Sequence, residues 1–120
     1  MKPLSNLVIG IVGPCTSGKS TLKKKLEELG YEVHHIAQEH SYVPDMWKKI
    51  TNPDILIYLN VSYETTLIRR NLNWHREEYD IQGYRLRHAF KHANLHINTD
   101  ALNPEEVLRS VLLFLQKGDD

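Results

Sequence analysis

Residues 13–20, GPCTSGKS, combine the residue types and the spacing with which a protein loop can hold phosphate. Two glycines, Gly13 and Gly18, frame the loop, and Lys19 and Ser20 follow the second of them. Glycine adopts backbone conformations that are closed to other residues, so successive N–H groups can turn inward around an anion. A helix that begins directly after the loop adds unpaired N–H groups and the positive end of its dipole. The pattern Gly-x-x-x-x-Gly-Lys-Ser is that of a P-loop, and it predicts nucleotide binding.

The polar side chains of the loop have expected roles. We expect the Lys19 ammonium to reach the β- and γ-phosphates as a point charge, and the Ser20 hydroxyl to bind Mg²⁺. The alternative is a glycine-rich turn without a ligand, which is disfavoured because an apolar run precedes the loop and a helical pattern follows it. Thr21 is predicted to contact the α-phosphate. The predicted nucleotide-binding residues of this segment are Gly13, Pro14, Cys15, Thr16, Ser17, Gly18, Lys19, Ser20 and Thr21.

Cys15, the one cysteine of the chain, lies inside the loop and allows two interpretations. The favoured one is a small side chain at a variable position, in keeping with the general behaviour of cysteine. The other is a redox-sensitive thiol that is acidified by nearby backbone N–H groups and by Lys19. A single cysteine excludes an internal disulfide and fits a reducing compartment.

Candidates for a catalytic acid or base follow from the rule that ligands of open α/β sheets lie beyond the carboxyl ends of the strands. Asp54 precedes its predicted strand and is therefore excluded, and Asn60, which follows that strand, is neutral. Glu39 follows another predicted strand, and we expect it to be the general base or a partner of Mg²⁺ through water. The alternative is a solvated loop carboxylate, the ordinary fate of glutamate. Polar residues close to Glu39 in the sequence are Gln38, His40 and Asp45.

Arginine is distributed unevenly along the chain. Five of the six arginines lie between residues 69 and 87, where there is no lysine: Arg69, Arg70, Arg76, Arg85 and Arg87. The planar guanidinium binds phosphate oxygens through two N–H groups and keeps its charge. We expect Arg69, Arg70 or Arg76 to contact a phosphate. The alternative is a solvated helix face that pairs with the acidic residues at positions 77, 78 and 80.

Strands that alternate with helices must position these residues. Continuous apolar runs at 7–12 and 55–59 are typical of strands buried on both faces of a parallel sheet. Further strands are predicted at 31–37 and 95–98, and helices at 18–30, 43–50, 62–72, 80–93 and from 104 onward. This alternation predicts a three-layer α/β/α fold with a small, mostly parallel sheet, doubly wound, in a single domain of residues 1–120.

Composition excludes several classes of protein. Fifteen basic residues balance fifteen acidic residues, so nothing indicates a nucleic-acid or anionic-membrane partner. No apolar run approaches the roughly 18 residues of a membrane span, and residues 1–12 lack a cleavable signal pattern. We therefore expect a soluble cytoplasmic protein. His88 and His92 share a helix face, but no cysteine or acid completes a metal set, so they are interpreted as surface residues.

Three stretches resemble the P-loop nucleoside and nucleotide kinases, the adenylate kinase-like and thymidylate kinase-like group. They are GPCTSGKSTLKKKLEELGYEV, PDILIYLNVSYETTLIRR and INTDALNPEEVLRSVLLFL, which together cover most of the chain. The resemblance implies a phosphotransferase that uses ATP or GTP with Mg²⁺, with Arg69, Arg70 or Arg76 as lid arginines. It also implies that Thr99 and Ala101, in the loop after the last strand, lie beside the base. Only about residues 37–53 occupy the space where such kinases insert an acceptor-binding segment.

Two hypotheses for the function follow. The first is a small phosphotransferase that moves the γ-phosphoryl group of ATP or GTP to a small-molecule acceptor, held between residues 37–47 and the arginine segment. Tyr42 and Trp47 could line that acceptor site, although their spacing also suits core packing. The second is a nucleotide-binding NTPase or switch module without a small acceptor, which the short acceptor region favours. A weaker variant of the second binds nucleotide and catalyses nothing.

Overall fold

The computed structural model describes residues 6–69 and 73–118 of the chain. Four strands in these residues form one sheet in the order β2-β1-β3-β4, and each neighbouring pair is parallel. The strands are β1 (Val8–Val12), β2 (Glu32–His35), β3 (Ile55–Asn60) and β4 (Leu95–Asn98). The predicted α/β class is confirmed, and every strand pair within the described part of the chain is parallel.

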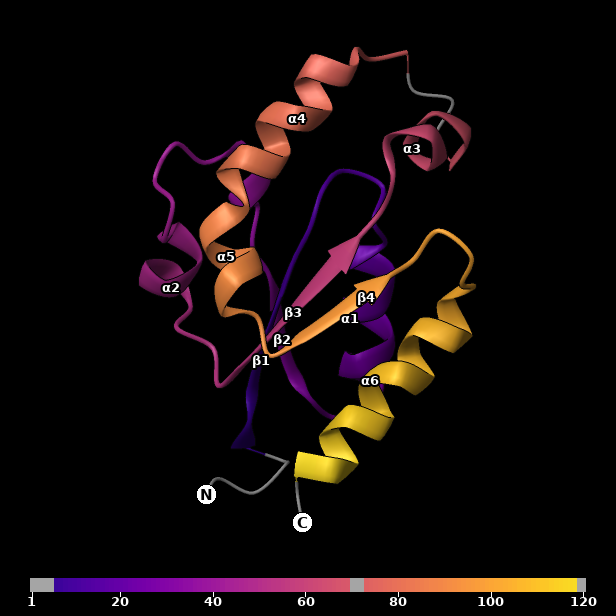
Figure 1. Ribbon diagram of the computed structural model, residues 1–120. Helices are drawn as coiled ribbons and strands as arrows, with labels where there is room; N and C mark the ends of the chain where they lie inside the picture. Colours follow the sequence, from indigo (N-terminus) through magenta and orange to yellow (C-terminus); the bar gives the residue numbers. More distant parts are fainter. Residues whose placement is uncertain (1–5, 70–72, 119–120) are drawn as a thin grey trace.

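Helices cover both faces of this sheet, as Figure 1 shows. The helices α1 and α6 lie on one side, and α2 and α5 lie on the other. A 3₁₀-helix, η2, follows β2 directly, and α3 follows β3. The bounds are α1 (Lys19–Glu28), η2 (Gln38–His40), α2 (Met46–Ile50), α3 (Tyr63–Arg69), α4 (Arg76–Arg85), α5 (Arg87–His92) and α6 (Pro104–Gly118). This is the predicted arrangement of three layers.

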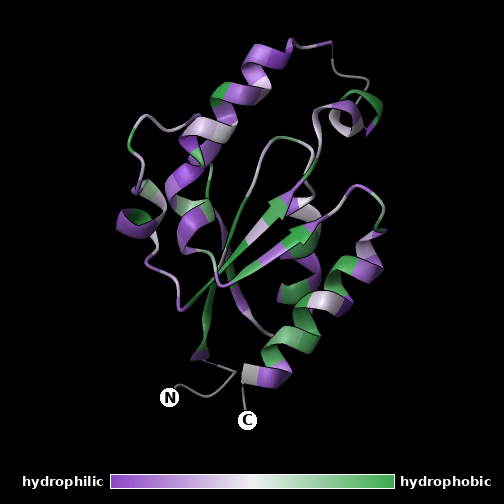
Figure 2. Cartoon of the chain, in the orientation of Figure 1, coloured by the Kyte–Doolittle hydropathy of each residue, from purple (hydrophilic) through white to green (hydrophobic). Residues whose placement is uncertain are grey.

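The two central strands explain why helices pack on both sides. In β3, Ile57 and Leu59 face the α1 and α6 side, whereas Leu56 and Tyr58 face the α2 and α5 side. Successive side chains of a strand point to opposite faces, so an unbroken apolar run buries both. Figure 2 shows the hydrophobic residues concentrated in the strands and on α6, and hydrophilic residues along most of α4.

The larger core joins α1 and α6 to the sheet. Leu22 and Leu26 of α1 and Val111 and Leu115 of α6 are each at most 2% exposed. Their spacing of four residues places each pair on one helix face. This packing holds the amino-terminal end of α1 beside the end of β1, which is where the glycine-rich loop lies.

The helix predicted at 80–93 is wrong in its bounds, because the structure has two helices there. Helix α4 begins at Arg76, after an extended His75 (φ −83°, ψ 151°), and ends at Arg85. The chain tightens at Leu86, whose amide donates both to the Gln82 carbonyl oxygen (3.0 Å) and to that of Gly83 (3.2 Å). Leu86 is fully buried, so packing of this one side chain accompanies the break between α4 and α5.

The order of the strands determines where a ligand can enter. From β1 the chain passes to β2 on one side, whereas β3 and β4 lie on the other. The direction of winding therefore reverses at β1, and open α/β sheets bind ligands in the crevice outside the carboxyl ends of the strands at such a point. The loop of residues 13–20 leaves the carboxyl end of β1. None of the helices in the described ranges has the length and apolar character needed to cross a membrane.

Candidate functional site

The glycine-rich loop, residues 13–20, connects β1 to α1, and its backbone conformation requires glycine at two positions. A Cβ on Gly13 would overlap the carbonyl oxygen of Leu59 and come within 2.7 Å of the Ser17 hydroxyl oxygen. Gly18 has φ 101°, a left-handed conformation that side chains disfavour. Thr16 is also left-handed, with φ 67°. When left-handed residues alternate with right-handed ones, successive backbone N–H groups of a loop point toward one position.

The first turn of α1 extends this set of donors. Leu22 is the first residue whose amide donates back to the loop, to the Gly18 carbonyl oxygen at 3.1 Å. In the described chain, no backbone carbonyl accepts from the amides of Lys19, Ser20 and Thr21. Unpaired amides at a helix N-terminus attract anions, and the helix dipole adds to the attraction.

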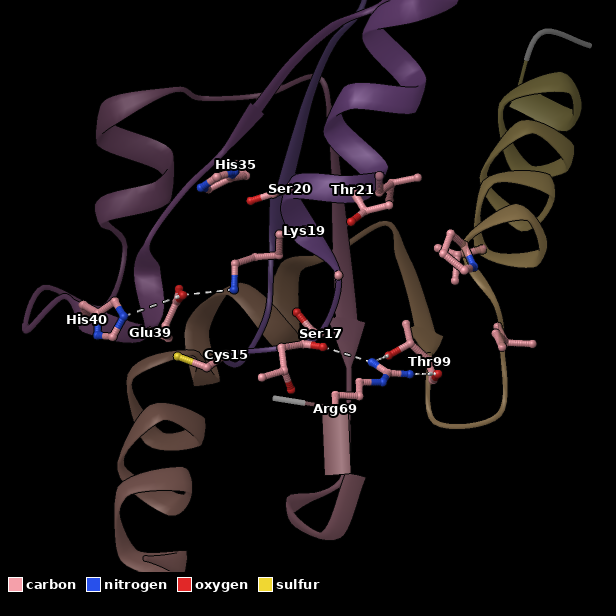
Figure 3. Close-up of a pocket in the computed structure, with 16 residues that line it drawn as sticks. Cys15, Ser17, Lys19, Ser20, Thr21, His35, Glu39, His40, Arg69 and Thr99 are labelled. Carbon is pink, nitrogen blue, oxygen red and sulfur yellow. Dashed lines mark hydrogen bonds and ion pairs between the residues drawn. The ribbon is translucent and has the colours of Figure 1, made fainter. Parts of the chain in front are cut away.

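Lys19 is held at the concave side of the loop by three acceptors. Its ammonium donates to the carbonyl oxygens of Gly13 (2.7 Å) and Pro14 (3.1 Å). It also lies 2.9 Å from Glu39 Oε2 (Figure 3). Lys19 is 9% exposed and Glu39 is 4% exposed, so this is a buried ion pair. The structure thus brings together the two charged residues that the sequence analysis selected on separate grounds.

The neighbouring Gln38 explains how Glu39 is placed. Gln38 is fully buried, and its side-chain amide donates to the carbonyl oxygens of Val43 (2.8 Å) and Arg85 (3.2 Å). Its Oε1 accepts from the Trp47 amide at 2.8 Å. Gln38 therefore anchors η2 to α2 and α4 and points away from the loop, and the next side chain, Glu39, faces Lys19.

Three buried oxygen atoms near the loop make no hydrogen bond to any residue that the structure describes. They are Thr16 Oγ1, Ser17 Oγ and Glu39 Oε1. Buried polar groups are ordinarily paired, so each unpaired atom calls for an explanation such as a ligand or water. All three belong to residues that line one cavity. We take them as evidence that the cavity is built to receive a polar group.

Arg69 approaches the loop from the opposite side. One of its terminal nitrogens, Nη1, donates to the carbonyl oxygen of Thr16 (3.0 Å) and to Thr99 Oγ1 (3.0 Å), and Nη2 donates to the Thr99 carbonyl oxygen. Thr99 in turn donates from its amide and hydroxyl to the Asn60 carbonyl oxygen, at 2.8 and 3.0 Å. The guanidinium therefore links α3, the glycine-rich loop and the segment between β4 and α6.

These groups line a cavity of about 590 Å³, within the usual range for small-molecule sites. We call the side formed by Cys15, Lys19, Glu39 and His40 the Glu39 end. The side formed by Arg69, Thr99, Leu102, Pro104 and Val107 is the Arg69 end. In Figure 3 the glycine-rich loop lies between the two. The remaining lining residues are Thr16, Ser17, Gly18, Ser20, Thr21, Leu22 and His35.

Several predicted site residues lie elsewhere. Arg76 does not line the cavity: it pairs with Glu64 (3.7 Å) and Asp80 (3.5 Å) and lies over the rings of Tyr63 and Tyr79. Ala101 is exposed beside the cavity without lining it, and Gly13 and Pro14 contribute carbonyl oxygens to Lys19 rather than cavity wall. The prediction for Arg70 falls outside the described residues.

The predicted acceptor-site aromatics do not line the cavity either. Trp47 is 7% exposed and packs in the core on the α2 and α5 side, and its indole N–H donates to His88 Nδ1 at 3.1 Å. Tyr42 is 87% exposed, with the Arg85 guanidinium 4.6 Å from its ring centroid. Of the two interpretations, core packing therefore describes Trp47.

Gln82 of α4 is a site residue that the sequence analysis missed. Its Oε1 accepts from the Cys15 amide at 3.0 Å, and its Nε2 donates to Cys15 Sγ at 3.1 Å. Gln82 is 6% exposed, so both bonds are shielded from water. It lies 67 positions from Cys15 in the chain and belongs to no motif, so only the tertiary structure shows this contact.

The protein shifts the pKa values of two ionisable side chains, Tyr58 and Asp100. Burial raises the pKa of the Tyr58 phenol to about 12, with smaller contributions from Tyr79 and from the Glu39 carboxylate. Tyr58 therefore stays protonated at neutral pH. Partial burial alone would raise the pKa of Asp100, but hydrogen bonds from Ser62 and Thr65 and the charge of Arg69 together outweigh it and hold that pKa below its ordinary value. Asp100 Oδ1 accepts from the Ser62 amide at 2.8 Å, which joins the segment after β4 to the start of α3.

Comparison with known proteins adds no family assignment. Neither the scan against protein-family models nor the search of curated proteins finds a match to this chain. The resemblance to P-loop kinases therefore stays a prediction from the sequence.

Proposed function

We propose that this chain binds the triphosphate of ATP or GTP in the cavity and transfers the γ-phosphoryl group to a small-molecule acceptor. The observation that carries the proposal is the convergence of three features at the Glu39 end. These are the unpaired amides at the start of α1, the Lys19 ammonium and a buried carboxylate with an unpartnered oxygen, Glu39 Oε1. An extended polyanion would satisfy the first two.

The donors favour an anionic ligand such as phosphate. Lys19 donates to the loop's own carbonyl oxygens at Gly13 and Pro14, which are neutral acceptors that a phosphate oxygen would outcompete by its charge. The amides of the loop and helix are fixed by the fold before a ligand arrives. Such preorganised donors stabilise the charge that spreads over the γ-phosphoryl oxygens during transfer, without reorganisation at that moment.

Mg²⁺ fits the oxygen groups that the cavity offers. Ser20 is exposed and lines the cavity, and Glu39 Oε1 is a buried carboxylate oxygen without a partner in the described chain. Hydroxyl and carboxylate oxygens are the ligands that Mg²⁺ prefers. Bound with the triphosphate, the cation would neutralise part of its charge. Ser20 would then hold it directly, and Glu39 would contact it through water.

The other role for Glu39 is that of general base. In that case its carboxylate takes the proton from the acceptor hydroxyl as that oxygen bonds to the γ-phosphorus and the bond to the β-γ bridging oxygen breaks. Burial beside Lys19 restricts Glu39 to one orientation. Both roles place the carboxylate beside the γ-phosphoryl group, and both require the same side chain.

The Arg69 end suits the rest of the nucleotide. Leu102, Pro104 and Val107 supply apolar surface beyond the loop, and an aromatic base buries well against such side chains. Thr99 lines the same end, as the sequence analysis expected of the segment beside the base. The Arg69 guanidinium lies between this apolar surface and the glycine-rich loop, within reach of a phosphate on the loop.

One observation favours the second candidate, an NTPase without a small acceptor. From the segment 37–53, only Glu39 and His40 line the cavity, because Trp47 is in the core and Tyr42 faces solvent. The described cavity therefore offers little wall for an acceptor beyond these side chains and His35. Water would then be the acceptor.

Product analysis distinguishes the two candidates. The protein is incubated with Mg²⁺ and ATP or GTP, alone and with nucleosides, nucleoside monophosphates or small alcohols, and nucleoside diphosphate and phosphorylated product are followed. Release that depends on an acceptor supports the phosphotransferase, and release without one supports the NTPase. No nucleotide binding by calorimetry and no thermal stabilisation by millimolar nucleotide would overturn both.

A further inference from the structure

The Glu39 end holds a second group of ligand atoms, of which the proposed nucleotide site requires only the Glu39 carboxylate. Cys15 offers a thiol sulfur, Glu39 a carboxylate oxygen and His40 an imidazole nitrogen, and the three ligand atoms all lie within 4.8 Å of one another. His40 Nε2 is 3.9 Å from Glu39 Oε2. Figure 3 shows the sulfur, the carboxylate and the ring on the same side of Lys19. The three side chains come from the glycine-rich loop and η2, which only the fold brings together.

Glu39 separates this group from an ordinary surface cluster. It is 4% exposed, so its carboxylate has lost most of its hydration. Lys19 pairs with Oε2, and Oε1 has no hydrogen-bond partner among the described residues. A buried carboxylate oxygen without a partner is costly unless something binds it. His40, by contrast, is exposed, and Cys15 is half-buried, so a cation can reach the group from solvent.

The chemistry of the three donors favours Zn²⁺ over Mg²⁺. Thiolate and imidazole are preferred ligands of zinc, and magnesium takes oxygen ligands almost exclusively. Three protein ligands with an open fourth position form the usual zinc site of an enzyme. Zinc bonds are 2.0–2.3 Å long, so the ligand atoms would have to close by roughly 1 Å, which rotation of the exposed His40 ring can supply.

A second shell is already in place around the sulfur. Gln82 Nε2 donates to Cys15 Sγ at 3.1 Å, and Gln82 Oε1 accepts from the amide of the same residue at 3.0 Å. These two bonds fix the position of Cys15 from α4. A donor to the sulfur stabilises the thiolate that zinc binds, and such partners orient metal ligands generally.

We propose that Cys15, Glu39 and His40 form a Zn²⁺ site at the open edge of the glycine-rich loop, distinct from the Mg²⁺ position at Ser20. The site goes beyond the proposed function, because it is defined by metal binding to the protein alone, with no nucleotide present. Where both hold, Zn²⁺ inhibits phosphoryl transfer, since the metal and the reaction use the same Glu39 carboxylate.

Cobalt substitution tests the site directly. Co²⁺ is titrated into the full chain without nucleotide, in a reductant that lacks thiols, and the absorption spectrum is followed. We expect one equivalent to bind with a sulfur-to-cobalt charge-transfer band in the near ultraviolet, and Zn²⁺ to displace it. Because zinc binds the thiolate, calorimetry in buffers of different ionisation heats should also detect proton release.

Matched variants assign the ligands. Cys15→Ser is expected to abolish the charge-transfer band. Gln82→Leu is expected to weaken metal binding about tenfold, and His40→Ala to weaken it more than that. His35→Ala is the control, because His35 lines the same cavity outside the ligand group and its loss should leave binding unchanged. Circular dichroism and thermal unfolding of each variant establish that it is folded.

Defined results would overturn the proposal. These are the lack of a charge-transfer band at stoichiometric Co²⁺, a band that survives Cys15→Ser, or affinity that falls with His35→Ala and not with His40→Ala. Zinc binding without any phosphotransfer would uphold the site and count against the proposed function, and phosphotransfer that is insensitive to Zn²⁺ would do the reverse.

Discussion

Lys19 and Arg69 both line the cavity beside the glycine-rich loop, and the protein surrounds the two cations differently. Lys19 is buried and pairs with a buried carboxylate, Glu39, at 2.9 Å. Arg69 is exposed, and it donates hydrogen bonds to the carbonyl oxygens of Thr16 and Thr99 and to the hydroxyl of Thr99, which are neutral acceptors. One end of the cavity therefore contains a charge pair shielded from water, and the other contains a cation spread over neutral acceptors at the surface.

Under the proposed function, the difference indicates which end of the cavity would perform phosphoryl transfer. Burying a charge pair costs desolvation energy, and replacing such a pair by apolar residues often leaves the stability of a protein unchanged or raises it. A buried pair such as Lys19 and Glu39 is therefore poorly explained by a purely structural role. Electrostatic interactions are also stronger where water is excluded. Within the proposed function, we therefore assign triphosphate binding and phosphoryl transfer to the Glu39 end, and only additional nucleotide affinity to the Arg69 end. Each assignment can be broken by substitution.

The largest effect is expected from Lys19→Met. Under the proposed function the ammonium faces the phosphates of the bound nucleotide, so nucleotide affinity and turnover should each fall by at least about 100-fold when it is removed. The buried Glu39 carboxylate is then left unpaired, and the free energy of unfolding should fall by about 3–5 kcal/mol. Calorimetry with nucleotide and urea denaturation measure the two effects. The double variant Lys19→Met/Glu39→Gln should regain stability but no activity; unchanged nucleotide affinity in the single variant would refute the assignment of this end.

Glu39→Gln should separate reaction from binding. The amide keeps the shape of the side chain and loses its charge, so turnover should fall by about 100-fold or more, with nucleotide affinity nearly unchanged. Steady-state kinetics and calorimetry give the two quantities. Glu32→Gln, at an exposed position of β2, is the matched control and should behave as the parent protein. Equal losses of affinity and turnover would show that Glu39 serves binding only.

Arg69→Lys should change affinity more than turnover. Lysine keeps the charge and loses the planar fork that contacts Thr16 and Thr99. Under the proposed function the guanidinium also contacts a phosphate of the bound nucleotide, and losing a hydrogen bond to a charged group costs about 1.5–3 kcal/mol, so KM should rise roughly tenfold or more while kcat changes little. Arg109→Lys, on the exposed surface of α6, controls for the substitution itself. A selective fall in kcat would instead place Arg69 among the groups that stabilise the transferring phosphoryl group.

The smallest effect is expected from Asp100→Asn, next to the Arg69 end. The folded state holds the pKa of Asp100 below its ordinary value of 3.8, so ionised Asp100 contributes stability above pH 3.8, and this contribution is lost as the pH falls further. The variant should lose no more than about 1 kcal/mol at pH 7, because the group is exposed, and progressively less below pH 3.8. Urea denaturation at pH 7 and pH 3 tests this. An equal loss at both values would mean that the charge of Asp100 contributes nothing.

Sequence patterns predicted the layered α/β fold, because each strand and helix has a pattern of apolar residues that can be recognised within a short stretch of chain. The apolar runs of β1 and β3 are buried on both faces, as predicted, since the pattern of a strand reports how many of its faces are covered. The break between α4 and α5 was not predictable in this way. It coincides with the burial of Leu86, and the helical pattern of apolar residues continues across it.

The parts of the candidate site that depend on short sequence motifs were predicted better than the parts that depend on distant residues. Because ligands of open α/β sheets lie beyond the carboxyl ends of the strands, the sequence predicted Glu39 near the loop. In the structure Glu39 forms an ion pair with Lys19. The same reasoning could not separate Arg69 from Arg76, since both are arginines close to one helix pattern. In the structure, Arg69 lines the cavity, whereas Arg76 pairs with Glu64 and Asp80 and does not line it.

By itself, the amino-acid sequence determined the glycine-rich loop between a strand and a helix, because the left-handed backbone of Gly18 depends on the residue type and on no distant contact. At Gly13, by contrast, a Cβ would overlap the carbonyl oxygen of Leu59, so that requirement comes from the tertiary structure. Tertiary structure decided which contacts the side chains around that loop make. Gln82 contacts Cys15 across 67 positions of chain, and Glu39 retains an oxygen without a described partner, because packing of distant helices places side chains with no regard to their separation in sequence.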